Sequence, residues 1–517
     1  MTTKEGHVWT AQNGLRSGFP CLGAINPVQL QAPRSNEIVD TIVIGSGYAG
    51  LVAARDLTIQ GQHLPIEFFS NFAHTFRAGK STFLVEARDR IGGRTWNGVV
   101  DGFNYEMGGT WIHWQMPHIY REISLYGMHD ELIVTQGEGG THDYFTLKGA
   151  DKEINMSHEE ELTMFGKVWG LFCNVDGVRA TAAMPYPFDS MYNREVMEQV
   201  DRLSCKDRLD AIRGQLTEDE AVMLEAILHQ MGGGPLDKMG LLDAVRWWAL
   251  GGWAGTGIND IGLRYRLRNG QSSLAKRIFD HALGTGKLSY VFSSPIAHIS
   301  QDMKGVVSVT SRAGTTWKAR HVICTIPLNV LGDISFSPQL SIRKQQAFRE
   351  GSTNHCNKVH FDVAGEGMVA WTNMTWPGKG VICAIADNCT PAGDTHLVAF
   401  GPAPTLVNGI QLKDGIEGVT RALEHVLPEG QVIKRVVYHD WNQDEFAKGT
   451  WCYLPPNFAT RYLDDLRRPH GNVFFANADW SDGWRGWIDG AVEQGTQVAL
   501  RVVQAQSEML KQRNSHL

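Results

Sequence analysis

The sequence predicts an α/β protein in which a Rossmann-like dinucleotide-binding domain is interrupted by a second, α+β domain. Two observations predict this fold. A strand, a glycine turn and a helix follow one another at residues 41–57, which is the local order that a dinucleotide site requires. Further strand patterns, at 288–292, 306–310 and 321–328, come after a long helical stretch, so the chain leaves the first domain and returns to it.

Length and composition narrow the class of protein. A chain of 517 residues is too long for one core, so two or three domains are expected. The composition, 43% hydrophobic and 20% charged, is that of a globular protein. A net charge of −7 and a pI near 6.3 argue against a nucleic-acid partner. The sequence also shows no secretory signal and no apolar run long enough for a transmembrane anchor.

The eight cysteines are scattered and form no CxxC pair. This spacing favours buried or free thiols over a disulfide framework or a zinc site. We therefore predict no metal site.

The glycine turn has a separate reason for each glycine. Gly45 permits the tight turn, Gly47 lets a pyrophosphate approach the backbone, and Gly50 lets the helix pack on the strand. The start of the helix then offers free N–H groups and a positive dipole end to phosphates.

The segments on either side of this turn are irregular. Residues 1–37 show no periodicity and are expected to form an arm over the body, neither a domain nor a targeting peptide. The second strand, 82–86, ends in Glu86, 36 residues after Gly50, whereas the acidic residue of such a site is expected roughly 20 residues on.

Removing residues 62–79 would restore the ordinary spacing, because a helix end at Gly61 would then meet the strand through a short turn. Two interpretations stay open. The segment is an insertion in a tolerant loop, or it is a retained intron. We favour the intron, because four phenylalanines in a surface loop would create an exposed apolar patch.

Two further motifs follow the glycine turn: LVEARDRIGGRT at 84–95 and MGGTWIH at 107–113. With the turn, they resemble the flavin-dependent amine oxidase family. The segment 483–493 is most similar to soluble fungal monoamine oxidases. The resemblance implies a discontinuous Rossmann-like FAD-binding domain with an interleaved α+β substrate-binding domain.

The implied domain boundaries follow from matching the motifs along the chain. The FAD-binding domain takes 38–115, 265–332 and 440–512, with 62–79 as the insertion or retained intron. The substrate-binding domain takes 116–264, with amphipathic helices at 204–216 and 218–231, and 333–439, with strands at 358–363, 381–386 and 397–401. Residues 513–517 form a C-terminal tail.

The resemblance also implies which residues hold FAD. Glu86 would take both hydroxyls of the adenosine ribose, Arg88 and Arg94 would face phosphate or ribityl oxygens, and the backbone of Ile296 would contact adenine. The full set expected at the cofactor is Gly45, Gly47, Tyr48, Ala49, Gly50, Glu86, Ala87, Arg88, Gly93, Arg94, Gly108, Gly109, Thr110, Ile296, Asp479 and Ala491.

Two positions depart from the family pattern. Where some members carry a cysteine bonded to flavin, this chain has Thr450, so the FAD is expected to be non-covalent. Cys452 is discounted, because a residue two positions along a strand lies about 7 Å away. The usual Gly-Glu is replaced by Asn477-Ala478, which leaves Asp479 as the candidate carboxylate.

Three residues are expected to act on the substrate. By resemblance, Lys358 holds a water against the flavin and assists the reaction with oxygen. Trp451 and Trp487 would form an aromatic cage that guides a neutral amine and offers π faces to its nitrogen. The main alternative is that both tryptophans belong to an ordinary core.

The implied reaction oxidises a primary or secondary amine to an imine, which water converts to an aldehyde and ammonia, while O2 is reduced to H2O2. The alternatives are a polyamine oxidase, an L-amino acid oxidase, a biosynthetic desaturase, and a non-catalytic flavin-binding protein inactivated by the insertion. An amino acid oxidase needs an arginine in the cavity, and a polyamine enzyme favours acidic residues at the entrance.

The chain ends in Ser515-His516-Leu517, one conservative change from a peroxisomal address. A peroxide-producing enzyme with this tail would be expected in the peroxisome, through an import receptor, and otherwise in the cytoplasm. A homo-oligomer is the other partner considered.

Overall fold

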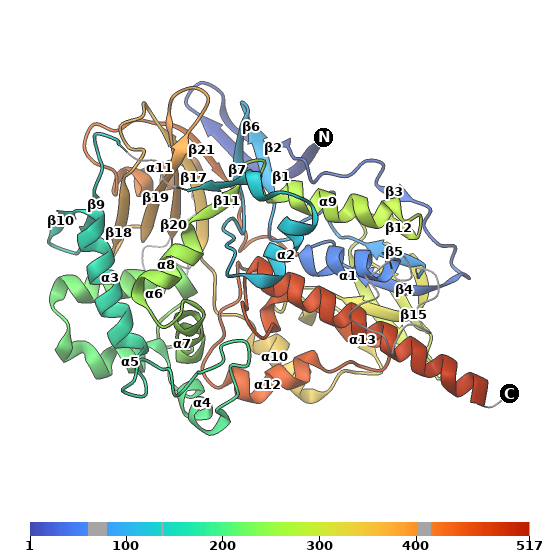
Figure 1. The fold of residues 1–517 in the computed structure, drawn as a ribbon. Helices are drawn as coiled ribbons and strands as arrows, with labels where there is room; N and C mark the ends of the chain where they lie inside the picture. The colour runs from blue at the N-terminus through green and yellow to red at the C-terminus, as the bar shows by residue number, and fades with distance from the viewer. Residues whose placement is uncertain (60–79, 136–138, 402–414, 516–517) are drawn as a thin grey trace.

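A computed structural model describes residues 1–59, 80–135, 139–401 and 415–515 and contains two nine-stranded sheets (Figure 1). One sheet lies in the lobe that also holds α1 (Tyr48–Ile59) and α13 (Ile488–Ser515), which pack side by side. The other lies in the lobe with most of the remaining helices. The α/β fold class is therefore confirmed.

The first sheet has a parallel centre in the order β15-β4-β5-β12. Its strands are β3 (Gln29–Leu30), β4 (Ile38–Ile44), β5 (Thr82–Val85), β12 (Leu288–Val291), β13 (Ile296–Gln301), β14 (Val307–Ser311), β15 (Thr316–Cys324), β16 (Ser335–Ser337) and β22 (Val473–Phe475). Three distant parts of the chain thus build one sheet, as the discontinuous domain requires.

The unit β4–α1–β5 has the predicted strand–turn–helix geometry. Gly45 has φ +98°, in the left-handed region that favours glycine. A Cβ on Gly50 would lie 1.9 Å from the carbonyl oxygen of Gly45. Both glycines are therefore required by the backbone itself, because no side chain fits there.

The second sheet has the order β10-β9-β18-β19-β20-β17-β21-β1-β2. Its strands are β1 (Thr2–Thr10), β2 (Gly14–Pro20), β9 (Phe145–Lys148), β10 (Glu153–Met156), β17 (Asn357–Val363), β18 (Thr372–Thr375), β19 (Cys383–Cys389), β20 (Thr395–Gly401) and β21 (Ile433–Tyr438). All seven residues of β17 are buried. Two small sheets pair β6 (Asn97–Val100) with β7 (Phe103–Glu106) and β8 (Leu132–Val134) with β11 (Tyr265–Leu267).

Three helices of the second lobe begin with a capping box, at Ser157, Ser204 and Thr217, which satisfies the free N–H groups of a helix start. These three are α3 (His158–Cys173), α5 (Cys205–Ile212) and α6 (Glu218–Gly232). The other helices, besides α1 and α13, are α2 (Pro117–Leu125), α4 (Arg194–Asp201), α7 (Leu241–Leu250), α8 (Gly255–Leu263), α9 (Gln271–Gly284), α10 (Ile342–Glu350), α11 (Gly415–Glu424) and α12 (Phe458–Arg467).

The prediction of an N-terminal arm over residues 1–37 is corrected by the structure. Strands β1 and β2 form a hairpin that extends the second sheet, because β1 pairs antiparallel with β21. The turn carries Asn13-Gly14, with Gly14 at φ +64°. Asn-Gly is a strong local signal for a hairpin, and it could have revealed this one.

The other predicted boundaries stay predictions, with two observed differences. β16 (Ser335–Ser337) pairs with β13 in the first sheet although it follows the predicted boundary at 332. Helix α13 continues to Ser515, into the predicted tail. The segment 62–79 and the last two residues lie outside the described residues, so the intron and the peroxisomal address also stay predictions. No helix of the described chain is long and apolar enough to cross a membrane.

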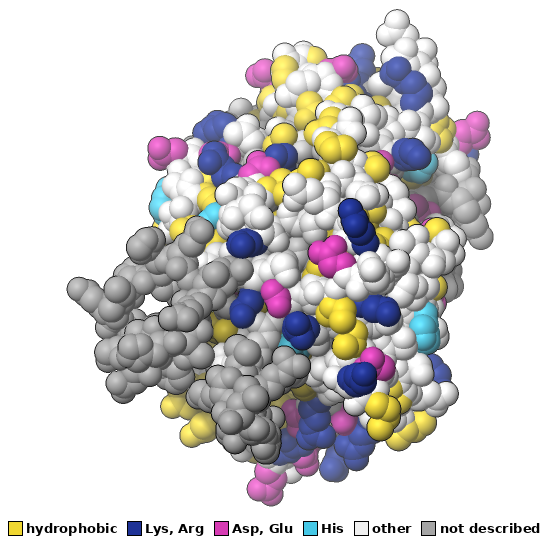
Figure 2. All heavy atoms as spheres, turned by 90° about the vertical axis from the view of Figure 1, so that its right-hand side faces the viewer, with side chains coloured by type: hydrophobic (Ala, Val, Ile, Leu, Met, Phe, Trp, Pro, Cys, Tyr) yellow, Lys and Arg dark blue, Asp and Glu magenta, His cyan; other side chains and the backbone are white. Residues whose placement is uncertain are grey.

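The surface carries both signs of charge. On the part of one face that the structure describes, Lys and Arg side chains alternate with Asp and Glu and with apolar side chains (Figure 2). All eight cysteines are free thiols, and all but Cys389 are buried.

Replacing Gly50 by alanine is expected to destabilise the protein by about 2 kcal/mol or more, because the new methyl group overlaps backbone. Denaturant unfolding measures the effect. The matched control is Gly284→Ala in α9, where a Cβ meets nothing within 4 Å and stability should be equal to or above wild type. Equal stabilities for the two variants would contradict the packing at Gly50.

Candidate active site

One cavity of about 310 Å³ is lined by residues from both lobes. At the first sheet it begins where β4 and β5 end, and on the other side it reaches α3, α6, α7, α8 and β20. Every residue predicted for the site lines this cavity except Gly50 and Asp479. The folded chain thus brings together segments that are more than 400 residues apart.

Glu86 directly follows β5 and is only 5% exposed. Its Oε2 accepts hydrogen bonds from the backbone N–H of Ser46 (2.6 Å) and from the Ser46 hydroxyl (2.8 Å). Its Oε1 accepts one from the backbone N–H of Arg88 (2.8 Å). The carboxylate is therefore fixed in place at the cavity wall, where the remaining lone pair of Oε1 can accept from one hydroxyl.

The glycine turn passes a direct test of fit for a cofactor. A Cβ added at Gly47 would meet only the Cα of Gly93, at 3.9 Å. The same addition at Gly45 would meet the Thr325 hydroxyl at 2.5 Å. Gly47 is thus not required by protein packing, and the space beside it opens into the cavity at the start of α1, where Tyr48 and Ala49 also line the wall. A pyrophosphate suits this place.

Arg88 and Arg94 line the cavity, but protein groups already hold both. Arg88 pairs with Glu5 (2.6 Å) and Asp444 (2.7 Å). Arg94 donates to the carbonyl of Thr450 (2.7 Å) and to Asp479 Oδ1 (2.6 Å). These contacts hold the two guanidinium groups at the wall.

Asp479 does not line the cavity, in contrast to the prediction. It lies behind Arg94, and its Oδ2 accepts from the backbone N–H of Leu328 (2.9 Å). Asn477 and Ala478 line the cavity instead. The 3-10 helix η6 (Ala478–Trp480) turns the chain there. Ala478 therefore faces the cavity, whereas the next residue, Asp479, is buried in the protein interior.

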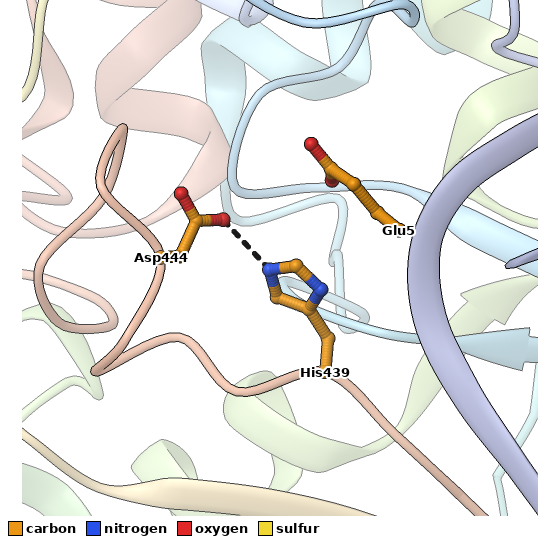
Figure 3. Close-up of side chains that lie close together, drawn as sticks. All are labelled: Glu5, His439 and Asp444. Atoms are coloured by element: carbon orange, nitrogen blue, oxygen red, sulfur yellow. Dashed lines mark hydrogen bonds and ion pairs between the residues drawn. The ribbon is translucent and has the colours of Figure 1, made fainter. Parts of the chain in front are cut away.

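Glu5, His439 and Asp444 bring three potential ligand atoms within 4.8 Å of one another (Figure 3). His439 Nε2 lies 2.7 Å from Asp444 Oδ2. Burial would raise the pKa of Glu5, but the guanidinium groups of Arg90 and Arg88 hold it at about 2. Arginine thus supplies the positive charge that these carboxylates need. The cluster ties strand β1 to the loop after Glu86.

Lys358, on β17, points its ammonium group at the edge of the cavity. The Nζ atom donates to the carbonyls of Glu106 (2.8 Å) and Gly108 (2.9 Å) and to the hydroxyl of Thr110. Burial lowers the pKa of Lys358 to about 8 and raises the pKa of Glu106 to about 7. Burial and the three hydrogen bonds donated by Nζ therefore act in opposite directions on the charge of Lys358.

Trp451 and Trp487 both line the cavity, each supported by a second aromatic ring. Trp451 meets Phe400 edge-on, with ring centres 6.1 Å apart, and its Nε1 donates to the carbonyl of Met231 (2.7 Å). Trp487 meets Trp247 with centres 5.2 Å apart. Phe400 and Trp247 line the cavity as well, and sequence reasoning did not single them out.

The substrate lobe contributes a largely apolar wall. Among the described lining residues from 116–264 and 359–439 there is no arginine, lysine, aspartate or glutamate: Phe165, Ile227, Gln230, Met231, Trp247, Ile258, Asn259, Gly262, Leu263 and Phe400. The helical periodicity of 218–231 was the one signal for part of this set, since it places Ile227 and Met231 on one face.

Thr450 lines the cavity and Cys452 does not. The Cys452 thiol is buried and lies 3.5 Å from the carbonyl oxygen of Asp479. That Cys452 forms no bond to flavin stays a prediction.

Comparison with known proteins identifies what these features are similar to. Residues 48–503 match the family model described as flavin containing amine oxidoreductase. The chain is 30% identical to pseudooxynicotine dehydrogenase of a Pseudomonas species, over 93% of this chain and 89% of that protein. It is 27% identical to nicotine dehydrogenase of Pseudomonas putida, over 90% and 88%, and 25% identical to putrescine oxidase of Kocuria rosea, over 90% and 96%.

Two solved structures share the fold. Cyclohexylamine oxidase from Brevibacterium oxydans superimposes with a TM-score of 0.70 at 20% identity, covering 91% of this chain and all of that one. Putrescine oxidase bound to putrescine gives 0.67 at 19% identity, covering 90% and 99%.

Replacing Gly47 by alanine should leave the unfolding temperature of the cofactor-free protein unchanged and weaken FAD binding at least about 10-fold, because the methyl group enters the phosphate space. Fluorescence titration of the cofactor-free protein with FAD measures this. An unchanged affinity would contradict the assignment of the glycine turn at Gly47 as the pyrophosphate site.

Replacing Glu5 by glutamine should lower the free energy of unfolding at pH 7 by about 1–3 kcal/mol, because Arg88 and Arg90 lose a charged partner. The folded-state pKa of Glu5 is depressed, so its contribution is complete above 4.5 and is lost as the pH falls toward about 2. The difference from wild type should shrink over that range, as followed by denaturant unfolding. The exposed control Glu37→Gln should match wild type throughout, and a pH-independent difference for Glu5→Gln would contradict the assignment.

Proposed function

The chain belongs to the flavin-containing amine oxidoreductase family, and on that premise we propose that it oxidises a neutral amine that carries an apolar, aromatic-sized group. The observation that supports this substrate class is the wall of the substrate lobe, where aromatic and aliphatic side chains alternate with only two amides, Gln230 and Asn259. Such a wall favours an uncharged substrate. A charged group on the substrate would lose its hydration there without gaining an ion-pair partner.

The same wall argues against two of the alternatives. A polyamine would bring a second ammonium group to a surface with no carboxylate among its described residues, and an amino acid would bring a carboxylate to one with no arginine. The arginines elsewhere in the lining, Arg88, Arg94 and Arg312, are already paired with carboxylates.

Two relatives support the preference for a bulky amine. Their names, pseudooxynicotine dehydrogenase and nicotine dehydrogenase, describe proteins that act on nicotine or a derivative. We propose an amine of comparable size for this chain.

When bound, FAD would supply the two-electron acceptor for oxidation of the carbon next to the amine nitrogen. The protein binds and orients. Glu86 and the turn at Gly47 hold the adenosine end, while Trp451 and Trp487 restrict the amine to one approach and exclude water from the apolar wall. The Nζ atom of Lys358 donates a hydrogen bond to the carbonyl of Gly108 at the edge of the cavity. From there the lysine can donate or accept a proton.

The fate of the electrons separates two versions of the enzyme. An oxidase passes them to O2 and releases H2O2, as predicted above. A dehydrogenase passes them to another acceptor, and the names of the two relatives at 30% and 27% identity specify dehydrogenases.

A panel of amines tests the proposal directly. Purified protein is mixed with aryl-alkyl amines, putrescine, spermidine and L-amino acids, with peroxide detection in one arm and a redox dye in the other. Turnover of the aryl-alkyl amines alone supports the substrate class. Turnover of putrescine or amino acids at equal kcat/KM contradicts it, and dye reduction without peroxide identifies a dehydrogenase.

Replacing Trp451 or Trp487 by alanine should reduce kcat/KM for the best amine by about 10- to 100-fold, because each ring confines the substrate. Bound FAD, measured by its absorbance, should stay at wild-type stoichiometry. The half-exposed Trp114 does not line the cavity, so Trp114→Ala serves as the control. Undiminished turnover in both cage variants would assign these tryptophans to the core.

A further inference from the structure

Strand β17 carries a polar face buried inside the second lobe. Polar and apolar residues alternate along it: Lys358, His360 and Asp362 are polar, and Val359, Phe361 and Val363 are apolar. The apolar residues pack into the hydrophobic core of the second lobe. Alternate residues share a face of the strand, so the three polar residues form a row that begins at the cavity. His396 on β20 and Arg435 on β21 lie directly opposite Asp362.

Hydrogen bonds join this row end to end. His360 Nε2 lies 2.7 Å from the carbonyl oxygen of Glu106, which also accepts from Lys358. His360 Nδ1 lies 3.1 Å from His396 Nε2, and His396 Nδ1 lies 2.9 Å from Asp362 Oδ1. Both rings are about 1% exposed, so water does not replace these partners.

The acceptors at the two ends of this hydrogen-bonded series fix the number of protons on the two imidazole rings. The carbonyl of Glu106 can only accept, so His360 Nε2 must carry a hydrogen. Asp362 also accepts, because its ion pair with Arg435 (3.1 Å) favours the ionised carboxylate, whose oxygens carry no hydrogen to donate. His396 Nδ1 must then carry a hydrogen too. The 3.1 Å contact between the rings needs a third hydrogen, whereas two neutral imidazoles hold only two.

We propose that His360 and His396 share three ring protons, so that the pair carries one buried positive charge, and that this charge tunes Lys358 as a positioning element of the proposed amine oxidation site. This inference rests on the proposed role of Lys358 for its second part only. The proton count depends on geometry alone.

The extra proton resides on His396. Burial and the positive charges of Lys358 and His396 hold the pKa of His360 well below 6.5, so this ring stays neutral and donates through Nε2. His396 is the ring in contact with the carboxylate of Asp362. Asp362 also lines a hollow of about 80 Å³ on the outer side, together with Asp101 and Arg435, through which protons can reach the row from solvent.

The charged and titratable groups that face the pair balance its charge. Asp362 neutralises His396, and Arg435 is shared between Asp362 and Asp101. The groups on all surrounding elements are Tyr105, Glu106, Arg266, Lys358, Asp362, Asp387, Arg435 and Asp101.

The row does not act as a proton wire to the cavity. It ends on the carbonyl oxygen of Glu106, and a carbonyl does not pass a proton on. Its effect on Lys358 is therefore electrostatic and geometric: a like charge lies on His396 of the neighbouring strand β20, and His360 occupies one of the two lone pairs of the shared carbonyl. Both effects lower the preference of Lys358 for its charged form.

The proton count can be measured without turnover. Holoenzyme with ¹⁵N-labelled histidine, at pH about 8 where ordinary imidazoles are neutral, should show one ring with both nitrogens protonated among its 19 histidines. The signal should vanish in His396→Gln. It should also vanish in Asp362→Asn, because the new amide can donate to Nδ1 and two ring protons then suffice. Only singly protonated rings in the wild type would overturn the proposal.

The effect on Lys358 is tested by the pH profile of turnover. The limb that belongs to Lys358 is the one abolished by Lys358→Met. In His396→Gln this limb should move up by about half a pH unit or more, because a like charge is gone. His425→Gln, on the same lobe and outside the row, is the matched control and should leave it in place.

A limb that does not move in His396→Gln would overturn the tuning of Lys358 even if the proton count holds. If no amine is turned over at all, the proposed function fails, while the NMR result still decides the proton count.

Discussion

The cofactor side of this molecule depends on how the carboxylate of Glu86 is held. Backbone N–H groups of Ser46 and Arg88, with the Ser46 hydroxyl, supply three hydrogen bonds to it. They fix the glycine turn against the loop after β5, so that Gly47 lies beside Gly93 with open space next to it. A charge held by backbone donors is pre-organised, and the cradle therefore exists before any ligand enters.

The loop after Glu86 is in turn held by segments distant in the sequence. Glu5 on β1 and Asp444 both pair with Arg88, and Glu5 also pairs with Arg90. The N-terminal hairpin precedes the residues matched by the family model, which begin at 48. It still supports the cofactor side, because the second sheet brings β1 next to β21.

Two kinds of environment meet in one cavity. The first lobe contributes backbone donors and paired charges, whereas the second contributes aromatic and aliphatic side chains. Lys358 lies where they meet, and burial lowers its pKa to about 8. The polar row behind it is buried without leaving a member unpaired, because every member of the row has a hydrogen-bond partner.

The sequence by itself determined the strand–turn–helix at Gly45–Gly50, Glu86 at the end of the second strand, and all but two of the predicted site residues in the cavity wall, because each depends on local spacing or on a family motif. Only the tertiary structure decided that Asp479 lies behind Arg94, that residues 2–20 extend the second sheet, and that His360 and His396 continue the row from Lys358. These features depend on which strands become neighbours. Strand pairing is set by packing over the whole chain, and no local pattern of residues records it.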